Sequence, residues 1–199
     1  MKKILTLLVA SVLLFFTACS DSKDAKEVKE TKSGPKTFLL KDINSGAQYN
    51  LKKTDDGFVV VGHEHKVVMF DMYATYCAPC QKEAQHLTEL QVKYADKFLI
   101  IALNTFEEVT NQYVNDEFRF KYGGYYFITN SKQNEEIISL ILKDIGYKRT
   151  IQIPFKVVLK DGKYQTLTDI YKADPDNKYY IGEIETKTIE KDLKEIFKK

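Results

Sequence analysis

The chain has 199 residues, in which 30 lysines and arginines nearly balance 28 aspartates and glutamates. This length suits one well-packed domain and is short for two. A formal net charge of +2 argues against a general nucleic-acid binder, which needs a basic excess to displace counterions. It also provides no strong field of one sign to steer a charged partner.

The first residues, 1–18, predict a signal peptide. Lys2 and Lys3 precede an uncharged apolar run from Ile4 to Phe16, as in a secretory signal. That run is too short to cross a bilayer as a retained helix. The sequence from Phe16 to Cys19 resembles the lipobox of bacterial lipoproteins, which implies that Cys19 is lipidated. An ordinary signal peptide cut after Ala18 is the alternative.

Residues 19–36 are rich in Ser, Asp, Lys, Glu and Thr and contain few apolar side chains. Such a segment buries too little surface to offset the entropy lost on ordering. We therefore expect a disordered tether between Cys19 and a folded domain that spans residues 37–199.

The folded domain begins with a predicted β-hairpin, in which extended runs at 38–43 and 47–51 flank a Gly-containing turn. Residues 66–73 form a continuous apolar run with one acid, typical of a strand covered on both faces. Apolar residues at three- and four-residue steps then predict an amphipathic helix that begins near Pro79.

The rest of the chain continues the alternation of strands and helices. The run 98–103 predicts a second buried strand, parallel to the first through a right-handed crossover. The later predicted elements are a helix with a weak pattern at 107–118, a short strand at 125–129, a helix that ends at Gly146, a hairpin from 153 to 167 and a C-terminal helix around 189–197. This order predicts an α/β fold with one mixed sheet between helices.

Two cysteines, Cys77 and Cys80, lie between the first buried strand and its helix. A disulfide between residues so close in sequence constrains the unfolded chain very little, so a purely structural role explains it poorly. If Cys19 carries lipid, these two are the only thiols left in an oxidising compartment. The spacing therefore indicates chemistry.

The segment from Val68 to Cys80 resembles the active-site segment of the thioredoxin superfamily, where a strand runs into an aromatic-Ala-X-aromatic-Cys-X-X-Cys turn. Ile153-Pro154, before a later strand, is similar to the superfamily's cis-proline segment. The hairpin, the signal and Glu83 make the chain more similar to the extracytoplasmic TlpA and ResA group. The resemblance implies a thioredoxin fold, with a central mixed sheet flanked by helices and an N-terminal β-hairpin extension.

Physical chemistry supports the same interpretation of the two thiols. At a helix N-terminus, free backbone N–H groups and the helix dipole favour an anion, so Cys77 should ionise more readily than a free thiol with a pKa near 8.5. The thiolate is the species that attacks a disulfide. Cys80, three residues further into the helix, faces Cys77 and is placed to resolve the mixed disulfide.

Two acids are candidate neighbours of the thiols. Asp71 lies six residues before Cys77, where thioredoxins carry a buried acid. An acid in an apolar strand should have a raised pKa, and we expect Asp71 to take the proton of Cys80; a backbone-bonded structural acid is the alternative. Glu83 is expected either to tune the thiols or recognise substrate, or to be a solvated helix residue.

The resemblance also implies a substrate groove. Pro154 is expected in the cis form beside the two cysteines, with the backbone of Ile153 free to pair with an extended peptide. Tyr76, Ala78 and Pro79, around the cysteines, are the other predicted substrate-binding residues. A trans proline that opens an edge strand is the alternative for Pro154.

These residues predict a membrane-anchored thiol:disulfide oxidoreductase on the periplasmic side of a bacterial membrane. Ala78-Pro79 resembles the intervening pair of reducing thioredoxins, which favours a reductant. The expected partners are disulfide-containing exported proteins, with apocytochrome c as one candidate, and a membrane thiol donor. No cofactor is expected beyond the redox-active Cys77–Cys80 disulfide, because no Gly-X-Gly-X-X-Gly follows a strand.

Metal binding is the alternative use of the two cysteines. A zinc site needs two more ligands; His63 and His65 fall in a predicted loop and His86 on the outer face of a helix, so no metal site is expected. A tethered Cu(I)-binding chaperone module that uses the two soft thiols is the second candidate function. Residues 106–124, which are rich in Tyr, Phe and Asn, contribute either a partner surface or plain packing.

Overall fold

The computed structural model describes residues 35–199. The predicted signal peptide at 1–18, the predicted lipidation site Cys19 and the tether as far as residue 34 lie outside the described residues. Within the described range, no helix combines the length and the apolar character that crossing a membrane requires.

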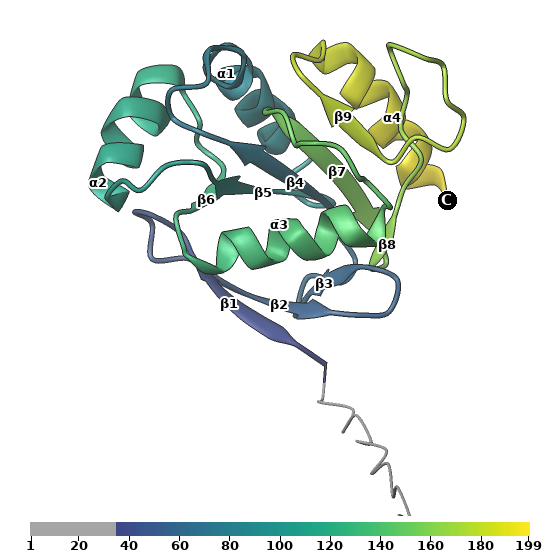
Figure 1. Cartoon of the computed structure of the whole chain (residues 1–199), viewed down its shortest axis with the longest axis horizontal. Coiled ribbons are helices and arrows are strands. Elements are labelled where there is room, and N and C mark those ends of the chain that lie inside the picture. The colour runs from purple at the N-terminus through teal and green to yellow at the C-terminus, as the bar shows by residue number, and fades with distance from the viewer. Residues whose placement is uncertain (1–34) are drawn as a thin grey trace, which may run out of the picture. The chain divides into compact units, whose positions relative to one another are not determined.

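A mixed sheet forms the centre of the domain (Figure 1). Its strands run in the order β6-β5-β4-β7-β8, and β9 also pairs with β7. β4 is parallel to β5, β5 is parallel to β6, and β7 is antiparallel to β4. The strands are β4 (Val67–Tyr73), β5 (Phe98–Asn104), β6 (Phe127–Thr129), β7 (Phe155–Lys160), β8 (Lys163–Tyr164) and β9 (Tyr179–Ile181). The predicted mixed sheet is therefore confirmed.

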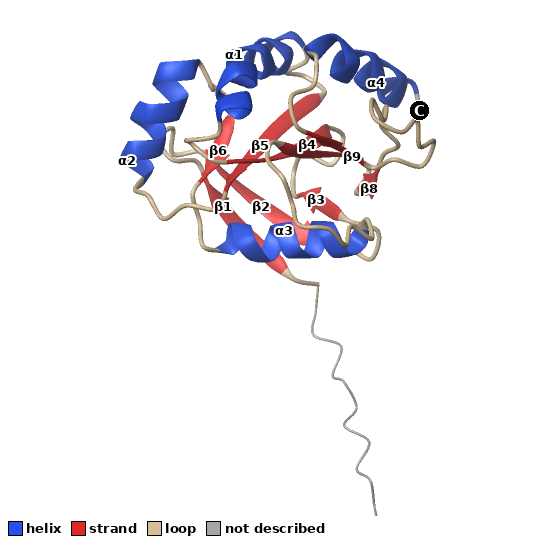
Figure 2. Ribbon diagram, turned by 45° about the horizontal axis from the view of Figure 1, so that its top comes forward, coloured by secondary structure: helices blue, strands red, loops and turns tan. Residues whose placement is uncertain are grey.

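Helices cover both faces of this sheet (Figure 2). On one face α1 (Ala78–Lys93) and α4 (Thr186–Lys198) pack their apolar stripes against side chains such as Met69 and Ile100. On the other face α3 (Gln133–Asp144) and the N-terminal strands pack against Phe70 and Ile101. Every residue of β4 and β5 is buried as a result, which explains their unbroken apolar sequence.

The N-terminal extension is a sheet of three antiparallel strands rather than the predicted two. The strands are β1 (Thr37–Lys41), β2 (Gln48–Lys53) and β3 (Phe58–Val60). The predicted hairpin is confirmed, and β3 was missed because three residues between turns carry too little periodicity to be distinguished from a loop. β9, also of three residues, was missed for the same reason.

The helical segment after β5 is irregular, which explains why its sequence has only a weak helical pattern. It begins as α2 (Asn111–Val114) and continues as η1 (Asn115–Phe120), which is a π-helix. A π-turn shifts each hydrogen bond by one residue, so apolar side chains no longer recur at the α-helical period. The predicted helix exists, but it begins four residues later than the expected start at 107.

A buried ion pair ties this segment to the N-terminal extension. The Arg119 guanidinium donates from Nη1 to Asp42 Oδ1 at 3.1 Å and from Nη2 to Oδ2 at 2.6 Å. Burial alone would raise the pKa of Asp42, but hydrogen bonds from Arg119 and from the backbone N–H of Ile128 hold it well below its ordinary value. Arg119 and Phe118 are buried, so this part of the predicted partner surface serves packing.

Candidate active site

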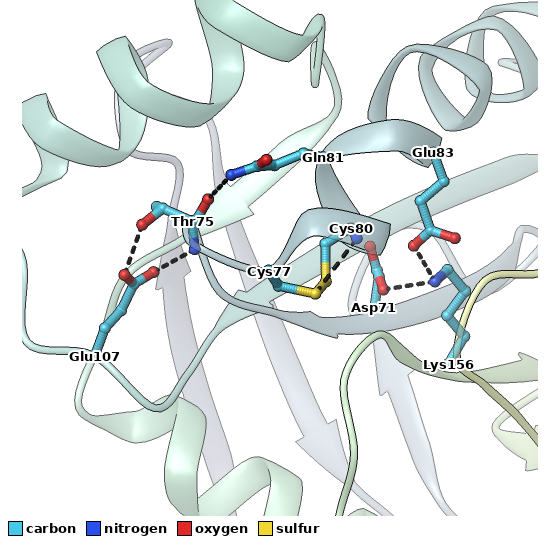
Figure 3. The surroundings of a disulfide bond; sticks show 8 residues. All are labelled: Asp71, Thr75, Cys77, Cys80, Gln81, Glu83, Glu107 and Lys156. Atoms are coloured by element: carbon cyan, nitrogen blue, oxygen red, sulfur yellow. Dashed lines mark hydrogen bonds and ion pairs between the residues drawn. A yellow bond between two sulfur atoms is a disulfide. The ribbon is translucent and has the colours of Figure 1, made fainter.

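Cys77 and Cys80 form a disulfide at the junction of β4 and α1 (Figure 3). The S–S distance is 2.10 Å and the Cα atoms are 5.2 Å apart. Cys77 is the N-cap of α1, and the backbone N–H of Cys80 donates to Cys77 Sγ at 3.3 Å. Cys77 is 6% exposed and Cys80 is 2% exposed. The predicted placement of a sulfur at a helix N-terminus is confirmed, and Cys77 is the more accessible of the two.

The loop before Cys77 is held by a carboxylate from the neighbouring strand's end. Glu107 accepts hydrogen bonds from the backbone N–H and the hydroxyl of Thr75, each at 2.6 Å. Gln81 Nε2 donates to the Thr75 carbonyl at 2.6 Å. These contacts, drawn in Figure 3, hold the turn in place before Cys77.

Glu107 was missed by the sequence analysis. β4 and β5 are parallel neighbours in register, with Tyr73 beside Asn104, so the loops that leave their carboxyl ends lie next to each other. The available signal was an acid three residues beyond the second buried strand, at the end of the sheet that carries the cysteines.

Three ionisable side chains meet in the interior behind the disulfide. Asp71 and Lys156 are directly opposite residues of β4 and β7, and Lys156 Nζ lies 3.2 Å from Asp71 Oδ1. The Glu83 carboxylate, from α1, also accepts a hydrogen bond from Lys156 Nζ. Lys156 is fully buried, Asp71 is 1% exposed and Glu83 is 5% exposed. We call Asp71, Glu83 and Lys156 the buried charge cluster.

Burial dominates the ionisation of this cluster. Desolvation raises the pKa of Asp71, although the charge of Lys156 opposes the rise. Desolvation also raises the pKa of Glu83 to about 7; Lys156 lowers it, and the nearby charge of Asp71 adds to the rise. Burial would lower the pKa of Lys156, but the two carboxylates outweigh it and raise the pKa. The single Lys156 ammonium group is thus the partner of both carboxylates.

The structure rules out one of the two interpretations of Glu83. Glu83 is not a solvated helix residue, because its side chain is buried against Lys156. The signal was present in the sequence: Cys80, Glu83, Leu87 and Leu90 follow one another at helical spacing, so Glu83 lies in the apolar stripe of α1. Its assignment to substrate binding or thiol tuning stays a prediction.

The other predicted site residues lie around the disulfide at different depths. The Ile153–Pro154 peptide bond is cis, as predicted, and it directly precedes β7. Ile153 is half-buried and packs against the apolar cluster that contains both cysteines. Tyr76 and Ala78 are exposed and Pro79 is half-buried. Their roles toward a substrate stay predictions.

Exposed aromatic side chains occur beside this site. Tyr76 is 62% exposed and Phe106 is 52% exposed, and the Tyr76 hydroxyl lies 3.5 Å from the Phe106 carbonyl oxygen. Phe106 has a φ of 63°, in the left-handed region that bulky residues rarely adopt. Such backbone outliers concentrate at functional sites. The first part of the predicted partner surface, around Phe106, is therefore exposed and beside the disulfide, whereas the part around Arg119 is buried.

The histidines lie where the sequence predicted. His63 and His65 are in the loop before β4, and His86 is exposed on α1. Among residues 35–199, no group of three or more His, Cys, Asp and Glu side chains is arranged to hold a metal ion.

Known proteins resemble this chain in sequence and in fold. The sequence model of the thioredoxin family, described as Thioredoxin, matches residues 50–135, which include both cysteines. Solved structures of the same fold cover most of the chain: StoA from Bacillus subtilis aligns with 80% of this chain and 97% of its own, at a TM-score of 0.51 and 17% identity.

Residues 50–135 thus match the thioredoxin family model, and the described residues have the thioredoxin fold. A thiol:disulfide interchange protein of the thioredoxin family from Chlorobium tepidum has the same fold, with a TM-score of 0.52, 15% identity, and coverage of 83% of this chain and 98% of its own. The predicted thioredoxin fold is confirmed.

Two curated relatives match part of the chain in sequence. It is 28% identical to the thiol-disulfide oxidoreductase ResA of Oceanobacillus iheyensis over 116 residues, 57% of this chain and 56% of ResA. It is 41% identical to the thioredoxin-like protein YneN of Bacillus subtilis over 83 residues, 42% of each chain. The chain thus spans about half the length of the curated relatives that it matches. The predicted similarity to the ResA group is confirmed.

The ionisation of Glu83 makes stability depend on pH. Its pKa is about 7 in the folded protein, against an ordinary value of 4.5, so between those values the native state binds more protons than the unfolded state. Stability from this group is therefore present below about pH 4.5 and is lost as pH rises through 7. We expect the free energy of unfolding of the oxidised protein to fall by roughly 3 kcal/mol across that window, as measured by urea unfolding. Glu83→Gln should flatten the profile, and an equally steep profile in that variant would contradict the assignment.

The Glu107 contact predicts a local stabilisation of the turn before Cys77. Glu107→Ala removes the charged acceptor of two hydrogen bonds and leaves the buried Thr75 hydroxyl without it. We expect a loss of about 1.5–3 kcal/mol in the free energy of unfolding. Glu108→Ala is the matched control, because Glu108 is exposed and should change little. Equal effects of the two substitutions would show that the contact does not hold the turn.

Proposed function

We propose that this chain is a thiol:disulfide oxidoreductase that works by dithiol exchange through Cys77 and Cys80. The observation that carries the proposal is the sulfur pair at the start of α1, with the Cys80 N–H directed at Cys77 Sγ. In the reduced protein, the same amide and the helix N-terminus would stabilise a Cys77 thiolate. The names of its relatives, a thiol-disulfide oxidoreductase among them, support the proposal.

The proposed reaction has two exchange steps. The Cys77 thiolate attacks one sulfur of a substrate disulfide, a Cys77–substrate bond forms, and the other substrate sulfur leaves with the electron pair. Cys80 then loses its proton and attacks Cys77 Sγ. The Cys77–Cys80 bond forms, the substrate leaves as its second thiolate, and the substrate has gained two electrons. The 5.2 Å Cα separation of the two cysteines permits the second step without backbone movement.

Asp71 is the proposed acceptor of the Cys80 proton. Its side chain is buried, and burial raises its pKa, so it binds a proton more readily than an ordinary aspartate does. Asp71 lies in β4, the strand that leads into the turn with both cysteines. In this proposal Asp71 acts in the resolving step, not in the first attack.

The proposed substrate groove lies on the accessible side of Cys77. The exposed side chains of Tyr76 and Ala78, with the half-buried Pro79, form one border of this groove. The backbone of Ile153 and the cis-linked Pro154 form the other and would pair with an extended peptide. Glu83, which is buried, would act on the thiols rather than touch the peptide.

The proposed setting is extracytoplasmic, with the domain held on the periplasmic side of a bacterial membrane through lipidated Cys19. The substrates would be disulfide-containing exported proteins, with apocytochrome c as one candidate, and a membrane thiol donor would supply electrons. The lipobox-like segment and the similarity to ResA support this setting. Ala78-Pro79 supports the direction of a reductant.

Trapping of the mixed disulfide tests the proposed exchange. Cys80→Ser should attack a substrate disulfide normally but stall, because no second thiol remains to release the product. We expect a covalent adduct on Cys77 that dithiothreitol removes, measured by mass spectrometry after incubation with oxidised insulin as a model substrate. Cys77→Ser, the matched control, should form much less adduct and should not reduce insulin.

The opposite pattern in this experiment would sink the proposal. Adduct on Cys80 in the Cys77→Ser variant, with none on Cys77 in the other variant, would reverse the two roles. Stoichiometric Cu(I) binding by the wild type together with no insulin reduction would instead support the copper-binding candidate, which no further observation favours at present.

The reduction potential tests the proposed direction. In a protein that reduces its substrates, the reduction potential of the disulfide should be well below that of strong oxidants, which is about −120 mV. We expect a value nearer that of thioredoxin, about −270 mV, from equilibration with glutathione or dithiothreitol followed by thiol alkylation. A value close to −120 mV would make the chain an oxidant and leave the exchange chemistry intact.

A further inference from the structure

The buried charge cluster contains a lysine that no part of the cysteine motif accounts for. Lys156 lies in β7, two residues after Pro154, and its side chain has no solvent exposure. Its Nζ contacts Asp71 of β4 and Glu83 of α1. Lysine is almost never fully buried unless it is paired. The contacts with the two carboxylates therefore explain how Lys156 is tolerated in the interior.

Glu83 and Cys80 belong to the same helix, and the pairing of β4 with β7 places the other two members of the cluster side by side. Cys80 and Glu83 are three residues apart on α1 and therefore lie on the same face of the helix. Asp71 stands opposite Lys156 in the register of β4 and β7. Figure 3 shows the Lys156 ammonium group between the carboxylates of Asp71 and Glu83.

The charges of the cluster do not balance when all three groups are ionised. Two carboxylates and one ammonium leave one uncompensated negative charge in the interior, which is costly in a low dielectric. One bound proton makes the cluster neutral. The unpartnered Oε2 of Glu83, which accepts no hydrogen bond within residues 35–199, is available to carry that proton.

The cluster reaches solvent at one point. Glu83 lines an open recess with Lys82, His86, Glu183 and Lys187. The charged groups that line this recess or lie against Glu83 come from three places in the fold. Lys82 and His86 belong to α1, Lys156 and Asp71 belong to the sheet, and Glu183, Glu185 and Lys187 belong to the start of α4 and the loop before it. Asp71, at 1% exposure, does not line this recess.

We propose that Lys156 is a positioning residue that holds Asp71 and Glu83 as one cluster beneath Cys80, where the two acids share a single exchangeable proton. The inference rests on the proposed exchange function and extends it to the route of the proton. In the resolving step, the Cys80 S–H bond breaks and its proton passes to ionised Asp71. The electron pair stays on Cys80 Sγ, which attacks Cys77. Glu83 releases the shared proton at the recess and then accepts the proton held by Asp71, so the cluster again holds one proton.

The resolving step can be timed with Ellman's reagent. Attack by Cys77 on this aromatic disulfide releases one coloured thiolate, and attack by Cys80 on the resulting mixed disulfide releases the second. Stopped-flow absorbance therefore separates the two steps in one experiment on the reduced protein, at a series of pH values.

The test variant is Lys156→Met, which removes the charge and keeps an unbranched side chain. Without the ammonium, both acids hold their protons more tightly, so fewer molecules have an ionised Asp71. We expect the second release to slow about tenfold at pH 7 and its pH midpoint to move up by about one unit, while the first release is unchanged. Lys163→Met is the matched control: Lys163 is exposed at the end of the same hairpin, and both releases should match the wild type.

A second measurement on the wild type covers the case in which Lys156→Met does not fold. Infrared difference spectra of the oxidised protein should contain the C=O stretch of one buried protonated carboxyl group, lost with a midpoint near pH 7 and absent from Glu83→Gln. The absence of any such titrating band, or an unchanged second release in a folded Lys156→Met, would overturn the inference. Failure of the wild type to react in either step would instead overturn the proposed function, and the infrared titration would still report on the cluster.

Discussion

The structure depends on one junction, at which the buried strand β4 ends and α1 begins. β5 and β7 pair with β4 on its two sides, and every residue of β4 is buried, so the position of its last residue is fixed. Cys77 follows as the N-cap of α1 and accepts the Cys80 N–H. A backbone amide that would otherwise lack a partner thereby points at sulfur.

Three acidic side chains lie near this junction, and they have different roles. Glu107, from the loop after β5, binds the turn through Thr75 and sets the position of the residues before Cys77. Asp71 and Glu83 lie on the core side, where burial raises the pKa of each. Burying two acids with one lysine opposes stability at neutral pH, which is understandable if the cluster serves proton transfer rather than folding.

The sequence predicted the parts of this arrangement that depend on local pattern. The apolar runs at 66–73 and 98–103, the helix after Pro79 and the cysteine spacing were sufficient for the fold and for the place of the disulfide. Lys156 was not recognised, because one lysine in a strand normally indicates a solvent-facing position. Its burial follows from the pairing of β7 with β4 and from the cover of α1, which no local pattern contains.

Short elements and long-range contacts account for the other differences. β3 and β9 have three residues each and are held by pairing with neighbours rather than by their own periodicity. The Glu107 contact joins residues 32 positions apart, and the Asp42–Arg119 pair joins residues 77 positions apart. Such contacts become visible only once the order of the strands is known.

The most direct test of the account is the ionisation of the two thiols in the reduced protein. The rate of alkylation of each cysteine by iodoacetamide, followed by mass spectrometry across pH, reports its thiolate fraction. The account predicts that Cys77 reacts first and that its reactivity titrates below the pKa of about 8.5 of a free cysteine. Faster reaction at Cys80, or a Cys77 profile at or above that of a free thiol, would contradict it.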